Sequence, residues 1–430
     1  MQKLLAVLLS IATFLTALSV SRNTVKAPED MEDFVPVVRF AVMSDTHIHY
    51  VTDVRTKRIQ RVLTMAYDDA QRDPNYKTVD AAIFAGDLTD DGRADQFIGF
   101  KAAVDSVLQP QTRFMAVVAK SHDGNTMQKG SLSFFESLTG DPTDYHYEIR
   151  GFHFIGLSAS KTAGEHYSAY QRAWLREQLD IAASDDPNKP IFVTHHEHVL
   201  DTVYGSSAFD GWGMDDFKDI LSAYPQIVDF SGHSHYPLND PRSIWQGDFT
   251  AVGTGAVYYA ELTVDKDRCV HPNDYRQIAQ AWIVEVDQKN SVRLRGFDAL
   301  SGTQLCSYTI HDPANANARE FTDAQQRAES SAPVFDKNAA VSARKLFGGY
   351  SVSVPAAEST DGKIVFVYRV RVTGADGEEK TAQYLVNNYW KADTYKTVSF
   401  RVSAQKGDTI TVTAENAYGM QSQPLTTVIR

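Results

Sequence analysis

Two hydrophobic patterns alternate along residues 37–312. Short runs rich in Val, Ile and Phe predict buried β-strands, whereas segments with apolar residues three or four positions apart predict amphipathic helices. This alternation is typical of an α/β fold in which helices cover the sheets. The clearest strands are expected at Val38–Met43, Ala81–Ala85, Phe114–Val118, Phe152–Leu157, Ile191–Thr194 and Ile227–Phe230, and the clearest helices at Arg58–Ala70 and Tyr170–Ala182.

The pattern changes after residue 312. Residues 313–332 are polar and end before Pro333, which predicts a helical or extended linker. Residues 333–430 contain strand-like runs separated by turn signals such as Ala375-Asp376-Gly377. They predict an all-β sandwich domain of the immunoglobulin or fibronectin type. Its strands are expected at Tyr350–Val354, Lys363–Thr373, Thr381–Leu385, Thr397–Ser403 and Thr409–Glu415.

The first residues carry an export pattern. Lys3 precedes an apolar run from Leu4 to Val20, and a polar stretch follows it. This order predicts a signal peptide at residues 1–20, a linker at 21–36 and a secreted or cell-surface protein. Because the run is close to the minimum length of a membrane span, an uncleaved N-terminal anchor is the alternative. No later segment is long and apolar enough to cross a bilayer.

Composition narrows the range of partners. The chain has 430 residues, of which 43% are hydrophobic, so it can bury more than one core. Its formal net charge of -12 argues against extended nucleic-acid partners, which require clustered Lys and Arg. A small anionic substrate would instead need local positive charge, such as a bound metal ion. The two cysteines, Cys269 and Cys306, either pair in an oxidising compartment or pack separately.

Five short polar motifs each follow a predicted strand. The carboxyl ends of strands in an open α/β sheet converge on one crevice, so motifs far apart in sequence can meet there. The motifs are Asp45-Thr46-His47, Gly86-Asp87-Leu88-Thr89-Asp90, Lys120-Ser121-His122-Asp123, Thr194-His195-His196 and Gly232-His233-Ser234-His235.

The residue types and spacing in these motifs suit a metal centre. Residues two apart after a strand point the same way, as in Asp45 with His47 and His233 with His235. Mixed carboxylate and imidazole ligands favour Zn, Fe or Mn over Ca. Asp87 follows a glycine, and its two oxygens can bridge two ions. Two ions about 3.5–4 Å apart can clamp the attacking and leaving oxygens of a phosphoryl displacement.

The motifs resemble, in type and order, those of the calcineurin-like metallophosphoesterase superfamily. This superfamily includes purple acid phosphatases and phosphodiesterases that act on cyclic nucleotides or glycerophosphodiesters. The resemblance spans Arg39–Ile310 and depends on the combination, since either histidine motif alone would be weak. It implies two packed sheets flanked by helices. It also implies hydrolysis of small phosphomonoesters or phosphodiesters by water that two metal ions activate, with Mn, Zn or Fe as candidates.

The resemblance also implies a role for each motif. The implied ligands are Asp45, His47 and His235 for the first metal ion, His195 and His233 for the second, and Asp87 as a bridge. His122 would stabilise the phosphoryl oxygens or protonate the leaving group, and Asp90 would orient His122. His196 and His198 follow His195 so closely that the ligand could lie one position away.

Two positions depart from the superfamily pattern. Ser121 stands where the family has an asparagine whose carbonyl oxygen binds the second metal ion. A hydroxyl is a shorter and poorer ligand, so this ion could bind weakly. The alternative function is therefore a metal-binding or adhesion protein with weakened catalysis. Asp91 stands where phosphoprotein phosphatases carry an arginine, which argues against protein phosphatase activity.

Aromatic residues outside the motifs have two interpretations. Asp210-Gly211-Trp212-Gly213 and Tyr258-Tyr259 could contact a leaving group, since aromatic residues often line pockets. In the last domain, Tyr384, Tyr389 and Trp390 belong either to the sandwich core or to a surface that contacts a glycan or a partner.

Overall fold

The computed structural model describes residues 34–124, 131–160, 166–207, 212–265, 268–392 and 394–430. The predicted signal peptide or anchor, and most of the linker at 21–36, lie outside these residues, as do the side chains of Cys269 and Tyr384. Within the described ranges, no helix has both the length and the hydropathy to span a bilayer.

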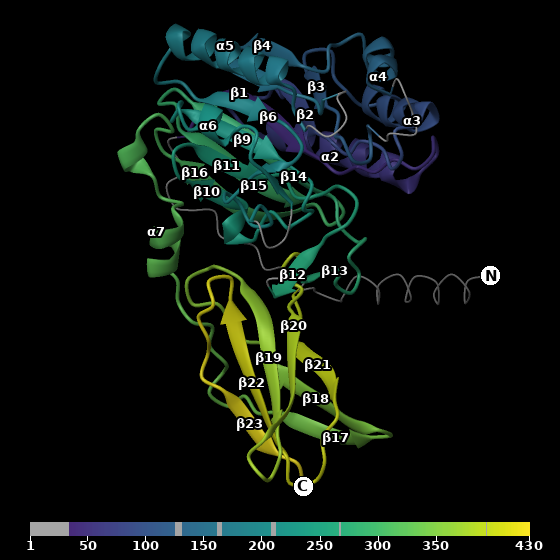
Figure 1. Cartoon of the computed structure of the whole chain (residues 1–430), viewed down its shortest axis with the longest axis vertical. Coiled ribbons are helices and arrows are strands. Elements are labelled where there is room, and N and C mark those ends of the chain that lie inside the picture. Colours follow the sequence, from purple (N-terminus) through teal and green to yellow (C-terminus); the bar gives the residue numbers. More distant parts are fainter. Residues whose placement is uncertain (1–33, 125–130, 161–165, 208–211, 266–267, 393) are drawn as a thin grey trace, which may run out of the picture.

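Two six-stranded sheets form the larger part of the molecule (Figure 1). The first has the order β16-β15-β14-β1-β2-β3, with β16 Thr303–Ile310, β15 Val292–Asp298, β14 Gln280–Asp287, β1 Pro36–Met43, β2 Ala81–Ala85 and β3 Arg113–Val117. The second has the order β10-β11-β9-β6-β5-β4, with β10 Ile244–Gln246, β11 Thr250–Gly253, β9 Ile227–Ser231, β6 Ile191–Thr194, β5 Phe152–Gly156 and β4 Tyr145–Ile149.

The two sheets pack face to face around an aromatic core. Phe40 of β1 packs its ring edge on Phe154 and Phe192 of the second sheet, with centroids 5.1 and 4.8 Å apart. Strand side chains alternate between faces, so Ala41 and Met43 join a different cluster on the outer face of the first sheet. Both faces of β1 are therefore buried, which explains why its sequence is apolar apart from the buried Arg39.

Helices cover the outer face of each sheet. Buried helix residues join one cluster with the first sheet and another with the second. The predicted two-sheet sandwich with helices on both sides is confirmed. The helices over the first sheet are α2 Val54–Arg72, α3 Ala94–Asp105 and α4 Ser131–Thr139, and those over the second are α5 Ala169–Asp185 and α6 Lys218–Leu221.

The strands that precede the motifs run parallel. β1 pairs parallel with β2 and β2 with β3, while β5 pairs parallel with β6 and β6 with β9. The carboxyl ends of the strands in each set therefore lie together. The five motifs begin within three residues of the ends of β1, β2, β3, β6 and β9, so the topology assembles them at the strand ends.

Residues 280–310 differ from the predicted alternation. They form the antiparallel strands β14, β15 and β16, which extend the first sheet. Strand β1 pairs antiparallel with β14, so the sheet is mixed. Both faces of β14 and β15 are buried, and the buried positions include the charged side chains of Glu285, Arg293 and Arg295.

All-β sheets follow the two-sheet region, as predicted. We call residues 333–430 the C-terminal β-region; it lies below the two larger sheets in Figure 1. One sheet has the order β17-β18-β21 and the other β20-β19-β22-β23. Their bounds are β17 Ser342–Leu346, β18 Gly349–Pro355, β19 Val365–Thr373, β20 Glu379–Val386, β21 Thr397–Val402, β22 Thr409–Asn416 and β23 Leu425–Val428.

Short elements complete the structure. The 3-10 helix η3 and the helix α7 occupy the predicted linker, and small strand pairs join β7 to β8 and β12 to β13. Their bounds are β7 His198–Val199, β8 Gly213–Met214, η2 Pro241–Ser243, β12 Leu262–Asp265, β13 Arg268–Val270, η3 Ala316–Ala318 and α7 Asp323–Ala328.

Three side chains that the sequence left open have defined environments. Cys306 carries a free, buried thiol, which does not support a disulfide with Cys269. Tyr389 and Trp390 are also buried, with exposures of 3% and 1%. Neither of these two aromatic residues can therefore form an exposed surface for a glycan. They pack instead between the C-terminal β-region and the two-sheet region.

Candidate metal centre

Five residues of the motifs have an unusual backbone. Asp45, His47, Asp87, His233 and His235 have φ values of 54°, 47°, 48°, 74° and 57°. Residues other than glycine seldom adopt this left-handed conformation, and each instance costs on the order of 1–3 kcal/mol. All five were predicted as metal ligands, so backbone strain is concentrated at the predicted centre.

The first group of converging ligands comprises Asp45, His47, Asp87 and His235, all of them buried. One ligand atom from each lies within 4.8 Å of the others. His235 Nε2 is 2.9 Å from Asp45 Oδ1 and 3.2 Å from His47 Nε2. Nitrogen ligands 2.0–2.1 Å from a tetrahedral ion lie about 3.3 Å apart, so the spacing of the two imidazoles matches one ion.

The second group comprises Asp87, His196 and His233. His196 Nε2 lies 3.2 Å from Asp87 Oδ2, and its Nδ1 donates to the carbonyl oxygen of Ala85 at 2.8 Å. The Nδ1 hydrogen bond fixes the ring, so Nε2 is the atom left for a metal ion. Asp87 belongs to both groups, as expected for a bridging carboxylate.

His195 lies elsewhere than the sequence analysis expected. Its Nε2 is 2.8 Å from Asp229 Oδ1, and both side chains are fully buried. Its ring packs against Phe217, with centroids 5.2 Å apart. Successive residues of an extended chain point to opposite sides, and here the second histidine faces Asp87. The structure therefore favours His196 over His195 as a ligand.

Glycines allow two motifs to approach the ligands closely. A Cβ atom at Gly86 would lie 2.6 Å from His196 Nδ1, and one at Gly232 would lie 2.6 Å from Asp45 Oδ2. Both distances are too short for any side chain. These glycines are therefore required by packing around the centre, and Gly86 also has a φ of 85°.

The buried carboxylates attract positive charge. Burial opposes ionisation of Asp45, but the His235 imidazole brings its pKa down to about 2. Burial likewise opposes ionisation of Asp87, yet His196 holds its pKa well below the ordinary value. Against the effect of burial, the carboxylates in turn raise the pKa values of His196 and His235.

The donor set fits a metal ion. Asp45 Oδ1 and His196 Nε2 are buried and have no partner in hydrogen-bond geometry, although each lies close to an opposite charge. His235 Nδ1 donates to the Tyr259 carbonyl at 3.2 Å, which leaves its Nε2 for the centre. The two acids and four imidazoles of these groups match the ligands of Zn, Fe or Mn.

His122 and Asp90 lie beside the first group. His122 packs its ring edge on His47, with centroids 4.5 Å apart, and its Nδ1 donates to the Asp90 backbone carbonyl at 2.9 Å. The Asp90 carboxylate instead faces Arg55, at 2.8 Å, His49, at 2.9 Å, and His47 Nδ1, at 3.3 Å. Asp90 therefore contacts His122 through its main chain, which differs from the predicted side-chain contact.

Ser121 lies at the edge of the second group. Its hydroxyl donates to Asp87 Oδ1 at 3.4 Å, and the residue is exposed. The converging ligand atoms of both groups come from Asp and His side chains. The structure thus places Ser121 next to the bridging residue without assigning it a ligand role.

Asp123 is a supporting residue that the sequence analysis did not single out. Its carboxylate accepts the main-chain N–H groups of Leu88 (3.0 Å), Thr89 (2.7 Å) and Ala119 (3.1 Å). It therefore fixes the turn that carries Asp87. Burial, and next the charge of Asp87, raise the pKa of Asp123 to about 6. Its position after His122 in the third motif was the available signal.

Aromatic rings flank both ligand groups. Tyr259 packs on His235, with centroids 4.0 Å apart, and Trp212 packs edge-on against His233, with centroids 4.8 Å apart. Both aromatic residues are partly exposed. Each ring therefore contacts one ligand histidine directly, Tyr259 in the first group and Trp212 in the second.

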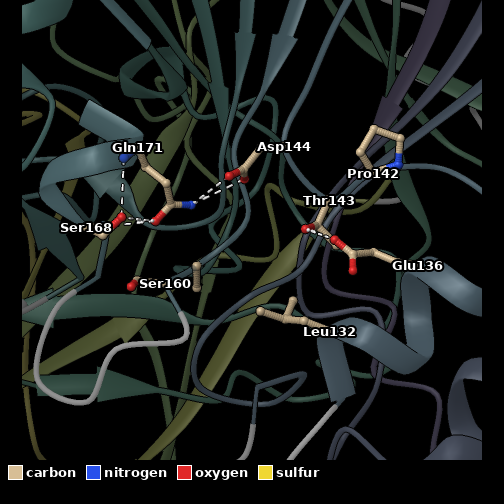
Figure 2. Close-up of a pocket in the computed structure, with 9 residues that line it drawn as sticks. Leu132, Glu136, Pro142, Thr143, Asp144, Ser160, Ser168 and Gln171 are labelled. Atoms are coloured by element: carbon tan, nitrogen blue, oxygen red, sulfur yellow. Dashed lines mark hydrogen bonds between the residues drawn. The ribbon is translucent and has the colours of Figure 1, made fainter. Parts of the chain in front are cut away.

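A separate cavity lies near the carboxyl end of β5. It has a volume of about 330 Å³. Figure 2 shows Gln171 joined by hydrogen bonds to Asp144 and Ser168, and Thr143 to Glu136. No predicted metal or catalytic residue lines it. The lining residues are Leu132, Glu136, Pro142, Thr143, Asp144, Ala159, Ser160, Ser168 and Gln171.

Comparisons with known proteins agree with this arrangement. Residues 38–237 match the family model described as calcineurin-like phosphoesterase. A protein named probable cyclic nucleotide phosphodiesterase, from Rhodococcus erythropolis, is 28% identical over 232 residues, which are 52% of this chain and 72% of that protein. The matched family segment contains all five motifs.

Two solved structures show more distant similarity. The anchor in the inner membrane complex of Plasmodium, GAP50, has a TM-score of 0.41 at 14% identity, over 65% of this chain and 92% of that one. A purple acid phosphatase from yellow lupin (Lupinus luteus) seeds has a TM-score of 0.41 at 12% identity, over 64% of this chain and 53% of that one.

Proposed function

Since residues 38–237 match the family model of calcineurin-like phosphoesterases, we propose that this chain hydrolyses small phosphodiesters with the help of two metal ions. One observation carries the proposal: two groups of converging ligands share a single carboxylate, Asp87. A shared carboxylate between two cation sites is the arrangement expected for a dinuclear phosphoesterase.

Each ligand group would hold one ion. Asp45, His47 and His235 would hold the first, His196 and His233 the second, and Asp87 both. Bound ions would lower the pKa of water and neutralise phosphate charge. The close approach of Gly86 to His196 and of Gly232 to Asp45 would restrict the positions of these two ligands before any ion binds.

His122 is proposed to act on the substrate. It is partly exposed and adjoins the first group through His47. Because its Nδ1 donates to the Asp90 carbonyl, Nε2 is the ring atom available to a phosphoryl oxygen or to the leaving group. A histidine held in this way can stabilise negative charge or supply a proton.

Diesters are favoured over other phosphate esters. The relative from Rhodococcus erythropolis is named as a probable cyclic nucleotide phosphodiesterase, and Asp91 replaces the arginine of protein phosphatases. The net charge of -12 disfavours polymeric nucleic acids. A small diester, of which a cyclic nucleotide is one class, fits these constraints.

The test compares matched chromogenic substrates. The full chain is assayed with bis(p-nitrophenyl) phosphate and p-nitrophenyl phosphate in the presence of Mn²⁺, Zn²⁺, Fe²⁺ or Co²⁺. The expected result is metal-dependent turnover with a higher kcat/KM for the diester. A higher kcat/KM for the monoester would refute the proposed preference for diesters. Bound metal without hydrolysis of either compound would refute the proposed phosphoesterase activity.

Ser121 supports a second candidate function. Its side chain is exposed and donates to Asp87 instead of joining a ligand group. A metal-binding protein with weakened catalysis would follow if the second ion were poorly held. Replacing Ser121 by asparagine separates the two functions.

Export is also proposed, from residues 1–20. Their basic start and apolar run support a signal peptide. Expression with and without residues 1–20 in a bacterial host, followed by fractionation, provides the test. Retention of the full chain in the cytoplasm would contradict export.

A further inference from the structure

The segment that follows the last two ligands lies beneath the C-terminal β-region. His233 and His235 stand at its start, and Tyr236, Leu238 and Asp240 are buried at 3%, 0% and 0% exposure. The two histidines already have a strained backbone. Their positions therefore depend on whatever holds residues 236–242.

Tyr389 of the C-terminal β-region contacts this segment twice. Its carbonyl oxygen accepts from Asn239 Nδ2 at 2.6 Å, and its hydroxyl donates to Asp240 Oδ2 at 3.2 Å. Asp240 also forms an ion pair with Arg242, at 2.6 Å. A buried carboxylate is stabilised by an ion pair and by hydrogen bonds; Arg242 supplies the charge and Tyr389 a hydrogen bond.

Gln280 links the same segment to the neighbouring residue, Trp390. Its Oε1 accepts the main-chain N–H of Leu238 at 3.0 Å, and its Nε2 donates to the Trp390 carbonyl at 3.1 Å. Gln280 is fully buried, so water cannot replace either bond. Leu238 is three residues after His235, and the amide thus connects the C-terminal β-region with the ligand segment.

An apolar cluster of the C-terminal β-region includes the chain neighbour of Tyr259, which contacts His235. Tyr389 and Trp390 pack in one cluster with Ala260, which follows Tyr259. The Tyr259 carbonyl accepts from His235 Nδ1, and the Tyr259 ring packs on the same imidazole. The remaining buried members of the cluster are Ala256, Leu262, Ile278, Phe366 and Val367.

We propose that the C-terminal β-region is a structural part of the metal centre, with Tyr389, Trp390 and Gln280 as positioning residues for His233 and His235. The inference rests on the metal-dependent function proposed above. It assigns a role to the last hundred residues other than attachment to a partner. Groups that orient metal ligands typically change metal affinity by about 10–100-fold when they are removed.

Three single substitutions in the full chain test this role. Tyr389→Phe removes only the hydroxyl that Asp240 accepts, and Gln280→Met removes both amide hydrogen bonds while keeping the side-chain length. Tyr368→Phe is the matched control, because that hydroxyl accepts the Ala357 N–H at 3.0 Å inside the C-terminal β-region. The control perturbs the same region away from the ligand segment.

The first measurement is hydrogen exchange of the metal-free protein. Faster exchange is expected at residues 236–242 in Tyr389→Phe and Gln280→Met, and parental exchange there in Tyr368→Phe. This readout requires neither bound metal nor turnover. A failure of this inference can therefore be distinguished from a failure of the proposed function. The proposed function is tested separately, by metal-dependent ester hydrolysis with the parent protein.

The second measurement is calorimetric titration with Mn²⁺. Affinity is expected to fall about fivefold in Tyr389→Phe and about tenfold in Gln280→Met, with a change below about twofold in Tyr368→Phe. Parental exchange at 236–242 in both test variants would overturn the inference. An equal loss of Mn²⁺ affinity in the control would overturn it as well.

Discussion

His196 Nε2 lies 3.2 Å from Asp87 Oδ2, whereas the preceding histidine pairs with Asp229 away from the centre. We therefore expect His196→Ala to lose the second metal ion. Loss of one ion from a dinuclear site should lower kcat/KM about 100-fold or more. Metal content by mass spectrometry and diester hydrolysis measure the two effects.

His195→Gln is the matched comparison. It should retain both metal ions, because His195 belongs to neither ligand group. It should lose about 2 kcal/mol of unfolding free energy, since the buried Asp229 carboxylate loses the imidazole 2.8 Å away. Denaturant unfolding gives this value. Loss of metal in His195→Gln with retention in His196→Ala would reverse the assignment.

Ser121→Asn should raise the affinity of the second site for its metal ion. The longer side chain brings a carbonyl oxygen toward the ion, whereas the serine hydroxyl donates to Asp87. An affinity gain of about tenfold for the weaker Mn²⁺ is expected, and Ser121→Ala should differ little from the parent. Activity in Ser121→Asn combined with none in the parent would instead support the metal-binding protein.

His122→Ala should lower kcat about 100-fold to 1,000-fold while leaving metal content unchanged. The dependence of this loss on the leaving group distinguishes the two possible roles of His122. If His122 protonates the leaving group, the loss should be smaller for nitrophenyl esters than for alkyl esters, because nitrophenolate needs no proton. An equal loss for both ester types would indicate stabilisation of the phosphoryl oxygens.

Ionisation of Glu285 should make the free energy of unfolding depend on pH. It is buried among Arg39, Arg293 and Arg295, at 2.7, 2.6 and 3.1 Å. Burial opposes ionisation, but these arginines hold the pKa of Glu285 below its ordinary value of 4.5. Its contribution is therefore full above about pH 4.5 and is lost as pH falls through the lower, folded-state pKa.

Glu285→Gln tests this contribution. It should cost about 3 kcal/mol at pH 7, because three buried arginines lose their acid. The difference from the parent should shrink as pH falls below about 4.5. Urea unfolding at several pH values measures both. A constant difference over that range would contradict the role of the carboxylate charge.

Local patterns were sufficient to predict the strand ends and hence the centre. Ala81–Ala85 and Ile191–Thr194 were predicted with the bounds that the structure gives, because short Val, Ile and Phe runs between polar turns define buried strands. The sequence alone could not show whether His195 or His196 faces the metal centre. Adjacent residues differ only in which side of the chain they face.

Long-range contacts could not be predicted either. The role of Tyr389 depends on Asp240, which is 149 positions away, and no periodicity reports such a contact. The main-chain contact from Asp90 to His122 likewise depends on loop conformation, and the residue types suggested a carboxylate contact instead.

Asp87→Ala tests the central claim most directly, by metal content and diester hydrolysis measured on the same preparation. The parent should bind about two Mn²⁺ ions per chain and hydrolyse bis(p-nitrophenyl) phosphate, whereas the variant should lose both properties because both ligand groups share this carboxylate. Parental turnover in Asp87→Ala would contradict the account.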